Sequence, residues 1–301
     1  MVFGLGLVNL DILMMLDREI EFKSKNLVKE QLFQLGGVVP TALIVLSRLG
    51  VPCQIHTVVA DDHHGKMLLE ILQKEKVDTS FVKVVEDQKT PISIVVVDGY
   101  TGERTILYTR GIYPSVDPEI FTIKFHKNSK LLITDGHNAK ATSKYIDLAH
   151  KNKVKTILDL GNPKQGKEEL IAKTDIVIVP KAYWKTLWPE VSPDEIAMNL
   201  QKQGPRTVVV TIGEKGCVVA DNDQVFHQPG FRVKAVDTNG AGDIFIGAFA
   251  YGILKSWSIR KTTEFASAIA AMSCTKIGKD EKIPRSEEKI LLFIKSYSRN
   301  Y

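Results

Sequence analysis

Short apolar and β-branched runs alternate with amphipathic helical stretches along most of this 301-residue chain. Residues 38–49 and 64–76 carry apolar side chains at helical spacing. Runs short enough to be buried strands lie at residues 54–59, 131–134, 156–159, 176–179 and 207–211. Such alternation is typical of βαβ units. The sequence therefore predicts an α/β fold with a mainly parallel central sheet and helices on both of its faces.

Two segments, at about residues 11–35 and 91–110, interrupt this alternation with strand-like runs separated by polar turns. Residues 92–97 and 104–108 flank the sequence Asp-Gly-Tyr-Thr-Gly, which is typical of a β-hairpin. We expect a small antiparallel sheet over the carboxyl edge of the main sheet, where ligands bind in open α/β folds. A lid over a ligand and a purely structural edge sheet are the two interpretations.

Composition excludes several classes of protein. With 44% hydrophobic and 25% charged residues, the chain is neither intrinsically disordered nor a coiled coil. Forty Lys and Arg against 35 Asp and Glu give a net charge of +5. This excess is spread along the chain apart from a Lys-rich stretch at residues 276–295, which we interpret as a solvated C-terminal face. We therefore expect no nucleic-acid partner.

The compartment is predicted from the cysteines and the hydropathy pattern. Cys53, Cys217 and Cys274 are far apart and lack metal-site spacing, which favours reduced thiols over disulfides. No apolar run reaches the length of a membrane span, so no membrane partner is expected. The apolar N-terminus has no preceding basic residues and is interpreted as a first strand rather than a signal peptide. The expected location is the cytoplasm.

The most informative motif lies at residues 237–243, which read Asp-Thr-Asn-Gly-Ala-Gly-Asp before an apolar helix that starts near Ala241. Free amides at a helix N-terminus, unobstructed by side chains, form a site for an anion such as phosphate. Asp243 in the first turn would accept a proton from a hydroxyl nucleophile beside that phosphate. The alternative is that Asp243 only complements the helix dipole.

These residues resemble the C-terminal signature of the PfkB, ribokinase-like carbohydrate kinases, and the resemblance covers essentially the whole chain. It implies a three-layer αβα sandwich with a small β lid, in one domain over residues 1–301. It also implies that Asp243 is the catalytic base and that the amides of Gly240, Ala241 and Gly242 form the anion hole. ATP and magnesium are the implied cofactors, and some family members add potassium near the Asp237 loop.

The N-terminal half carries further similarity to the family, and the resemblance implies roles for individual residues. Two polar residues of the Asn-x-Asp pattern and residues of the di-glycine motif would bind the sugar: Asn9, Asp11, Gly36, Gly37 and Thr41. Residues 211–216 are similar to the Thr-x-Gly-x-x-Gly turn of the nucleotide pocket, so Thr211, Gly213 and Gly216 would line the nucleotide.

The sequence departs from the family pattern at three places. Thr41 stands where many members have asparagine, and Val38 stands where several phosphosugar kinases have lysine. The Asn-x-x-Glu motif linked to magnesium is absent, since residues 179–183 read Val-Pro-Lys-Ala-Tyr. Magnesium is therefore expected to arrive with the nucleotide phosphates, and its protein ligands stay unassigned.

The expected reaction is transfer of the ATP γ-phosphoryl group to a hydroxyl of a small free sugar, similar to ribose or fructose. A nucleoside kinase is the first alternative, but Phe33 is the only aromatic residue near the predicted sugar site. A non-catalytic binding regulator is the second. Arg104 and Arg110 are interpreted as solvated strand residues, and Trp184 and Trp188 as packing residues. The resemblance also suggests a homodimer formed through the lid.

Overall fold

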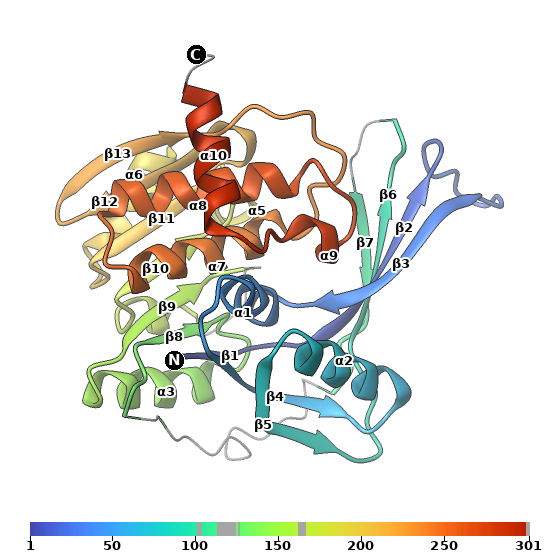
Figure 1. Ribbon diagram of the computed structural model, residues 1–301, viewed down its shortest axis with the longest axis horizontal. Coiled ribbons are helices and arrows are strands. Elements are labelled where there is room, and N and C mark those ends of the chain that lie inside the picture. The colour runs from blue at the N-terminus through green and yellow to red at the C-terminus, as the bar shows by residue number, and fades with distance from the viewer. Residues whose placement is uncertain (101–103, 113–124, 126, 162–166, 299–301) are drawn as a thin grey trace.

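The computed structural model describes residues 1–301 with the exception of 101–103, 113–124, 126, 162–166 and 299–301 (Figure 1). Its strands are β1 Val2–Leu5, β2 Asn9–Leu16, β3 Val28–Gly36, β4 Cys53–Ala60, β5 Val77–Val85, β6 Ile92–Val97, β7 Arg104–Tyr108, β8 Leu131–Thr134, β9 Lys155–Asp159, β10 Ile176–Val179, β11 Thr207–Thr211, β12 Gly216–Asp221 and β13 Gln224–Pro229. Its helices are α1 Val38–Arg48, α2 His63–Lys74, α3 Ala139–Lys151, α4 Glu168–Ile171, α5 Lys181–Leu187, α6 Pro193–Gln201, the 3-10 turn η3 Gly213–Lys215, α7 Ala241–Leu254, α8 Ile259–Ser273, α9 Lys279–Lys282 and α10 Glu287–Ser298.

The main sheet has nine strands in the order β13-β12-β11-β10-β9-β8-β1-β4-β5. All neighbours from β11 to β5 are parallel, and the two pairs at the β13 edge are antiparallel. The predicted strands at residues 131–134, 176–179 and 207–211 have the expected bounds. This arrangement confirms the predicted α/β fold with a mainly parallel sheet.

Two hydrophobic cores lie on opposite faces of this sheet, because successive strand side chains point to opposite sides. In β10, Ile176 and Ile178 belong to the core under α1, α2, α7 and α8. The intervening Val177 and Val179 belong to the core under α3, α5 and α6. The three layers predicted from the resemblance are therefore present, and the buried runs have no alternation in polarity because both faces are covered.

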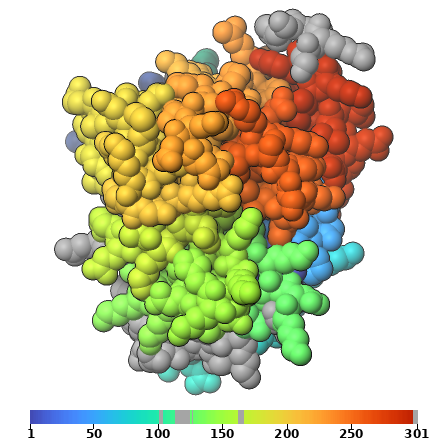
Figure 2. All heavy atoms as spheres, turned by 90° about the vertical axis from the view of Figure 1, so that its left-hand side faces the viewer, coloured from blue at the N-terminus to red at the C-terminus, as the bar shows by residue number. Residues whose placement is uncertain are grey.

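A second sheet of four strands, in the order β3-β2-β6-β7, occupies the predicted lid segments. Figure 1 shows it projecting from the side of the main sheet toward which β1 and β4 run. Figure 2 shows the opposite side of the molecule, where green, yellow, orange and red segments form most of the surface. The small sheet thus stands at the carboxyl edge of the parallel strands.

The expected small sheet is antiparallel at two of its three strand pairs. The pairs β2–β3 and β6–β7 are antiparallel, but the central pair β2–β6 is parallel. Both central strands leave the main body at the same place, since the Leu10 amide donates to the Pro91 carbonyl at 2.9 Å. Two strands that start together and run outward together pair in parallel.

The register of the small sheet gives its inner and outer faces different side chains. On the inner face, Leu13, Val95 and Val97 form a small buried cluster against Ile277. The strand register places five polar side chains on that same face: Asn9, Asp11, Gln34, Ser93 and Arg104. The outer face carries Phe33 and Leu107, which are 53% and 58% exposed.

Two other expectations concern the thiols and the membrane. Cys53, Cys217 and Cys274 are free thiols, and the first two are buried. No helix in the described ranges combines the length and the apolar character that crossing a membrane requires. The predicted cytoplasmic location stays a prediction.

Candidate active site

The loop at residues 237–243 forms a tight turn at the start of α7. Gly240 is the N-cap residue of this helix and has a φ angle of +75°, in the left-handed region that favours glycine. A Cβ added to Gly242 would meet nothing within 4 Å, so the space beside this turn is open. In the part of the chain that the structure describes, the amides of Gly240, Gly242 and Asp243 have no acceptor, whereas that of Ala241 makes a 3.4 Å contact with the Thr238 carbonyl. The turn therefore has the geometry of an anion site.

Asp243 lies in the first turn of α7, partly buried among charged groups. Burial raises its pKa from the ordinary 3.8 to about 6. The positive charges of Lys279 and Arg104 oppose this rise, and the negative charges of Asp11 and Asp135 add to it. A carboxylate with this pKa is mostly ionised at neutral pH and is a stronger proton acceptor than an ordinary aspartate.

The predicted sugar residues on β2 lie together at the root of the small sheet. The Asn9 Nδ2 donates to Asp11 Oδ1 at 2.6 Å and to Ser93 Oγ at 3.1 Å. Gly36 pairs directly with Asn9 across the β2–β3 ladder. A Cβ at Gly36 would overlap the side chains of Asn9 and Asp11, so only glycine leaves room for this polar pair.

The di-glycine segment also shapes the entry to α1. Gly37 has a φ angle of +103°, and a Cβ there would collide with the Leu7 carbonyl oxygen. Thr41 is fully buried inside α1, and its Oγ1 has no hydrogen-bond partner within the described residues. Gly37 is therefore required by the chain path at the entry to α1, while the Thr41 side chain has no exposed surface.

Two lysines at the site were missed by the sequence interpretation, which assigned the stretch at residues 276–295 to a solvated face. Lys279 and Lys282, the first and last residues of α9, are 7% and 2% exposed. The Lys279 ammonium lies 3.2 Å from Asp11 Oδ2 and donates to the Leu35 carbonyl at 2.6 Å. The interpretation was wrong at these two positions, although Lys276 and Lys289 are exposed as expected.

The small sheet reaches the anion turn through Arg104. This residue lies on β7, and its Nη1 donates to Thr238 Oγ1 at 2.9 Å. The interpretation of Arg104 as a solvated strand residue is therefore incomplete, because its guanidinium bridges the small sheet to the turn before α7. The small sheet and the anion turn are in direct contact, as a lid over the site requires.

Further charged residues follow the strands β8 and β9 at the same edge. Asp135 accepts from the amides of Leu7 and His137 at 2.8 and 2.9 Å. Asp159, at the end of β9, is buried, and burial raises its pKa to about 7 while Lys167 opposes the rise. The sequence interpretation assigned no role to these two carboxylates. Their position at the carboxyl ends of neighbouring buried strands is the signal that could have identified them, because these strand ends share one edge.

The predicted nucleotide residues lie at the end of β11, which is separated from β1 by the three strands β8, β9 and β10. The Thr211 carbonyl accepts from Trp184 Nε1 at 3.0 Å, and Thr211 Oγ1 accepts from the Lys181 amide at 3.3 Å. Gly213 has a φ angle of +70° and borders the Lys181 side chain. Gly216 is required by the fold itself, since a Cβ would collide with the Gln228 carbonyl.

The aromatic residues near this edge have a structural role, as expected. Trp184 is 5% exposed and holds Thr211, and Trp188 packs edge-on against Tyr183 with ring centroids 5.7 Å apart. Lys181, rather than an asparagine, follows β10 at the point where the Asn-x-x-Glu motif was expected. No group of three or more His, Cys, Asp or Glu suited to a metal occurs among the described residues. The magnesium ligands therefore stay unassigned.

Comparison with known proteins agrees with this geometry. The profile of the pfkB family carbohydrate kinases matches residues 1–285, and the chain belongs to that family. A 5-dehydro-2-deoxygluconokinase of Clostridium botulinum is 28% identical over 89% of this chain and 86% of its own length. The ketohexokinase of Mus musculus is 26% identical over 93% and 97%. A ribokinase of Arabidopsis thaliana, solved with ribose and ATP, has the same fold, with a TM-score of 0.81, 22% identity and 98% coverage of both chains. The expected family and fold are thereby confirmed, and the chain is a kinase of the ribokinase-like class.

Proposed function

We propose that this protein transfers the γ-phosphoryl group of ATP to a hydroxyl of a small free sugar similar to ribose or fructose. The observation that carries the proposal is one partly buried carboxylate, Asp243, directly beside a helix N-terminus with free amides and open space. Phosphoryl transfer needs a held nucleophile, an acceptor for its proton, and donors for the charge on the transferred group.

The roles proposed for the individual residues follow from these positions. Asp243 accepts the hydroxyl proton, and the amides of Gly240, Ala241 and Gly242 bind the transferred group. Asp11, together with Asn9, holds neighbouring sugar hydroxyls, because a carboxylate accepts two hydrogen bonds at once. Thr211 and Gly213 line the nucleotide. Magnesium, when bound, neutralises phosphate charge and is carried mainly by the nucleotide.

In the proposed function, the small sheet is a lid that closes over this site. Arg104 already contacts the anion turn, and Asn9 and Asp11 are part of β2 itself. A closed lid excludes water, which would otherwise compete with the sugar for the phosphoryl group. The lid interpretation is therefore preferred over an edge sheet without function.

A free sugar is favoured over a nucleoside by the position of the nearest aromatic side chain. Phe33 lies on the outer face of the small sheet, opposite to Asp11 on the inner face, and is 53% exposed. It therefore offers no surface on which a base beside Asp11 could stack. Val38 in place of a lysine favours a sugar without a phosphate group.

The substrate class is tested by measuring ADP formation with Mg·ATP and a panel of free sugars, sugar phosphates, sugar acids and nucleosides. We expect turnover with one or a few free pentoses or ketohexoses. Turnover restricted to nucleosides would replace the sugar assignment by the nucleoside alternative. ATP binding without turnover on any compound would favour the regulator.

The pH dependence follows from the raised pKa of Asp243, whose charged form is the base. We expect kcat/KM for the sugar to be level above about pH 7 and to fall about tenfold per pH unit well below pH 6, as Asp243 becomes protonated. The measurement is a pH profile at saturating Mg·ATP. A profile that stays level down to pH 4.5 would contradict the assigned base.

Substitution Asp11→Asn tests the sugar subsite. Loss of the charge weakens the hydrogen bonds to sugar hydroxyls and leaves Lys279 without its carboxylate partner. We expect kcat/KM for the sugar to fall roughly ten- to a hundredfold, in keeping with about 1.5–3 kcal/mol for a charged hydrogen bond. The KM for ATP should not change, and Asp17→Asn beyond the end of β2 is the matched control. An equal rise in both KM values would exclude a sugar-specific role.

The apolar outer face of the small sheet supports the proposed homodimer. Ile12, Phe33, Ile94 and Leu107 lie side by side across its four strands. We expect sedimentation at micromolar concentration to show a dimer, and the double substitution Phe33→Glu with Leu107→Glu to give a monomer. Leu292→Glu, at a 57% exposed position on α10, should leave the dimer intact. A monomeric wild-type protein would contradict the proposal.

A further inference from the structure

The turn before α7 contains a buried ion pair. The Lys282 ammonium lies 2.6 Å from Asp237 Oδ2, and each side chain is only 1% exposed. The same ammonium donates to the Asn239 carbonyl at 2.7 Å. One positive charge thus joins two oxygens of the loop that carries Gly240, and it comes from α9, some forty residues further along the chain.

Asp237 organises the backbone of the anion turn. Its Oδ1 accepts from the Asn239 amide at 2.8 Å, and its own amide donates to the Cys274 carbonyl at 3.2 Å. A buried carboxylate needs a partner of opposite charge, because transfer from water without one is strongly unfavourable. Lys282 supplies that charge, so the shape of the turn depends on it.

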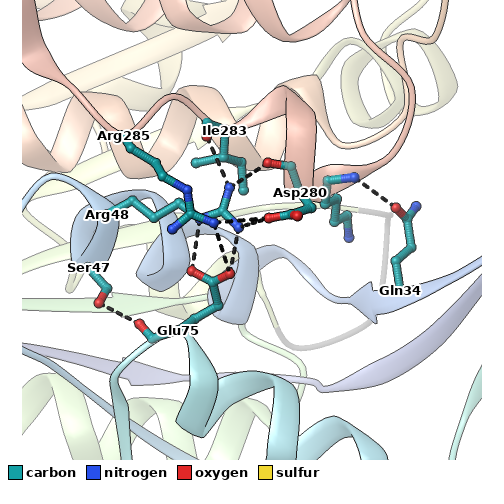
Figure 3. Close-up of polar contacts among 8 residues, drawn as sticks. Gln34, Ser47, Arg48, Glu75, Asp280, Ile283 and Arg285 are labelled. Atoms are coloured by element: carbon teal, nitrogen blue, oxygen red, sulfur yellow. Dashed lines mark hydrogen bonds and ion pairs between the residues drawn. The ribbon is translucent and has the colours of Figure 1, made fainter.

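The short helix α9 is held firmly enough to place this charge. Figure 3 shows Arg48 of α1 between Glu75 and Asp280, with bonds to the carbonyls of Asp280 and Ile283 at 2.7 and 3.0 Å. Lys279 and Lys282 lie three residues apart, which puts both on one side of a helical turn. The Arg48 cluster thereby fixes the segment from which both lysines enter the site.

A potassium ion near the Asp237 loop, which the family resemblance allowed, does not fit these residues. The carboxylate and carbonyl oxygens that would bind it already converge on the Lys282 ammonium. Burial lowers the pKa of Lys282, and the positive charge of the nearby Lys279 acts in the same direction. A third positive charge at this point would meet repulsion and too few free oxygens.

We propose that Lys282 is a positioning residue that replaces a free monovalent cation at the anion turn, so that this kinase works independently of potassium. The expected effects on turnover rest on the proposed function, whereas the expected effects on the melting temperature do not. Lys282 does not touch the reacting atoms, and it acts by holding Asp237 and Asn239, and with them the amides of the turn.

The wild-type protein gives the first test. Turnover and the melting temperature are measured in potassium, sodium and tetramethylammonium chloride at equal ionic strength. We expect both quantities to agree across the three salts, with rates within twofold. A severalfold activation or a clear stabilisation that is specific to potassium would overturn the proposal.

The variant Lys282→Met gives the second test, with Lys276→Met, an exposed lysine nearby, as the matched control. In tetramethylammonium chloride we expect Lys282→Met to lose at least tenfold in turnover. Potassium or ammonium should restore part of this loss saturably and raise the melting temperature of the variant, because a ligand of the folded state stabilises it. A folded variant that none of these cations rescues would show a merely structural role and overturn the proposal.

The double variant Asp237→Asn with Lys282→Met covers the case in which the single variant does not fold. It buries no unpaired charge, so we expect it to fold, to turn over slowly and to be insensitive to potassium. Wild-type turnover by this double variant would overturn the positioning role. The melting temperatures answer the cation question even if no substrate is turned over, which separates failure of this inference from failure of the proposed function.

Discussion

Substitution Asp243→Asn is expected to lower kcat with the sugar by about a thousandfold, because the amide cannot accept the hydroxyl proton. The side chain keeps its size, so the turn at Gly240 and the amides of α7 should stay in place. The KM for ATP is therefore expected to change little. The measurement is steady-state ADP formation, with circular dichroism and a melting curve to confirm folding.

Asp223→Asn is the matched control for this substitution. Asp223 lies exposed in the turn between β12 and β13, so the same chemical change there should leave kcat within twofold of the wild type. If Asp243→Asn kept a tenth or more of the activity, Asp243 would not be the base. The interpretation of this residue as a partner of the helix dipole alone would then be preferred.

Substitution Arg48→Met is expected to cause a large loss of stability. The Arg48 side chain is 4% exposed and pairs with Glu75, whose side chain is 11% exposed. Removing one partner of a buried pair costs about 3 kcal/mol or more, since the other charge stays buried. For a chain of this size we expect the melting temperature to fall by about 5 °C or more. Turnover should fall as well, because α9 loses its bonds to Arg48.

Arg285→Met serves as the control within the same cluster. Arg285 is 64% exposed and reaches Asp280 at 3.1 Å, so its loss should change the free energy of unfolding by less than about 1 kcal/mol. The effect of Arg48→Met should also diminish in acid. The hydrogen bond from Arg48 holds the pKa of Glu75 below its usual value, so the pair stabilises the folded state above that range and loses its effect as Glu75 becomes protonated. Equal effects of the two substitutions would contradict this account of the cluster.

The order of strands and helices could be predicted because it depends on local patterns. The runs at residues 131–134, 176–179 and 207–211 are continuous apolar stretches bounded by polar residues, and each is a strand with those bounds. The parallel pairing of β2 with β6 could not be predicted in this way. It depends on where two segments eighty residues apart leave the main sheet.

The candidate site also contains residues that could be predicted from local sequence and residues that could not. Asp243 and the glycines of the anion turn were predictable because seven consecutive residues carry the motif. Lys279 and Lys282 were not, because a Lys-rich stretch near the C-terminus is normally solvated. Only the tertiary packing shows that two of these ammonium groups are buried against Asp11 and Asp237, which lie far away in sequence.

The most direct test of the proposed phosphoryl transfer is identification of the reaction product. The protein is incubated with Mg·ATP and the best sugar of the panel, and the mixture is followed by ³¹P NMR and mass spectrometry. We expect a sugar monophosphate to form in equal amount to ADP, with no inorganic phosphate, and with the rate lost in Asp243→Asn. Formation of ADP together with inorganic phosphate, or an unphosphorylated sugar, would contradict the account.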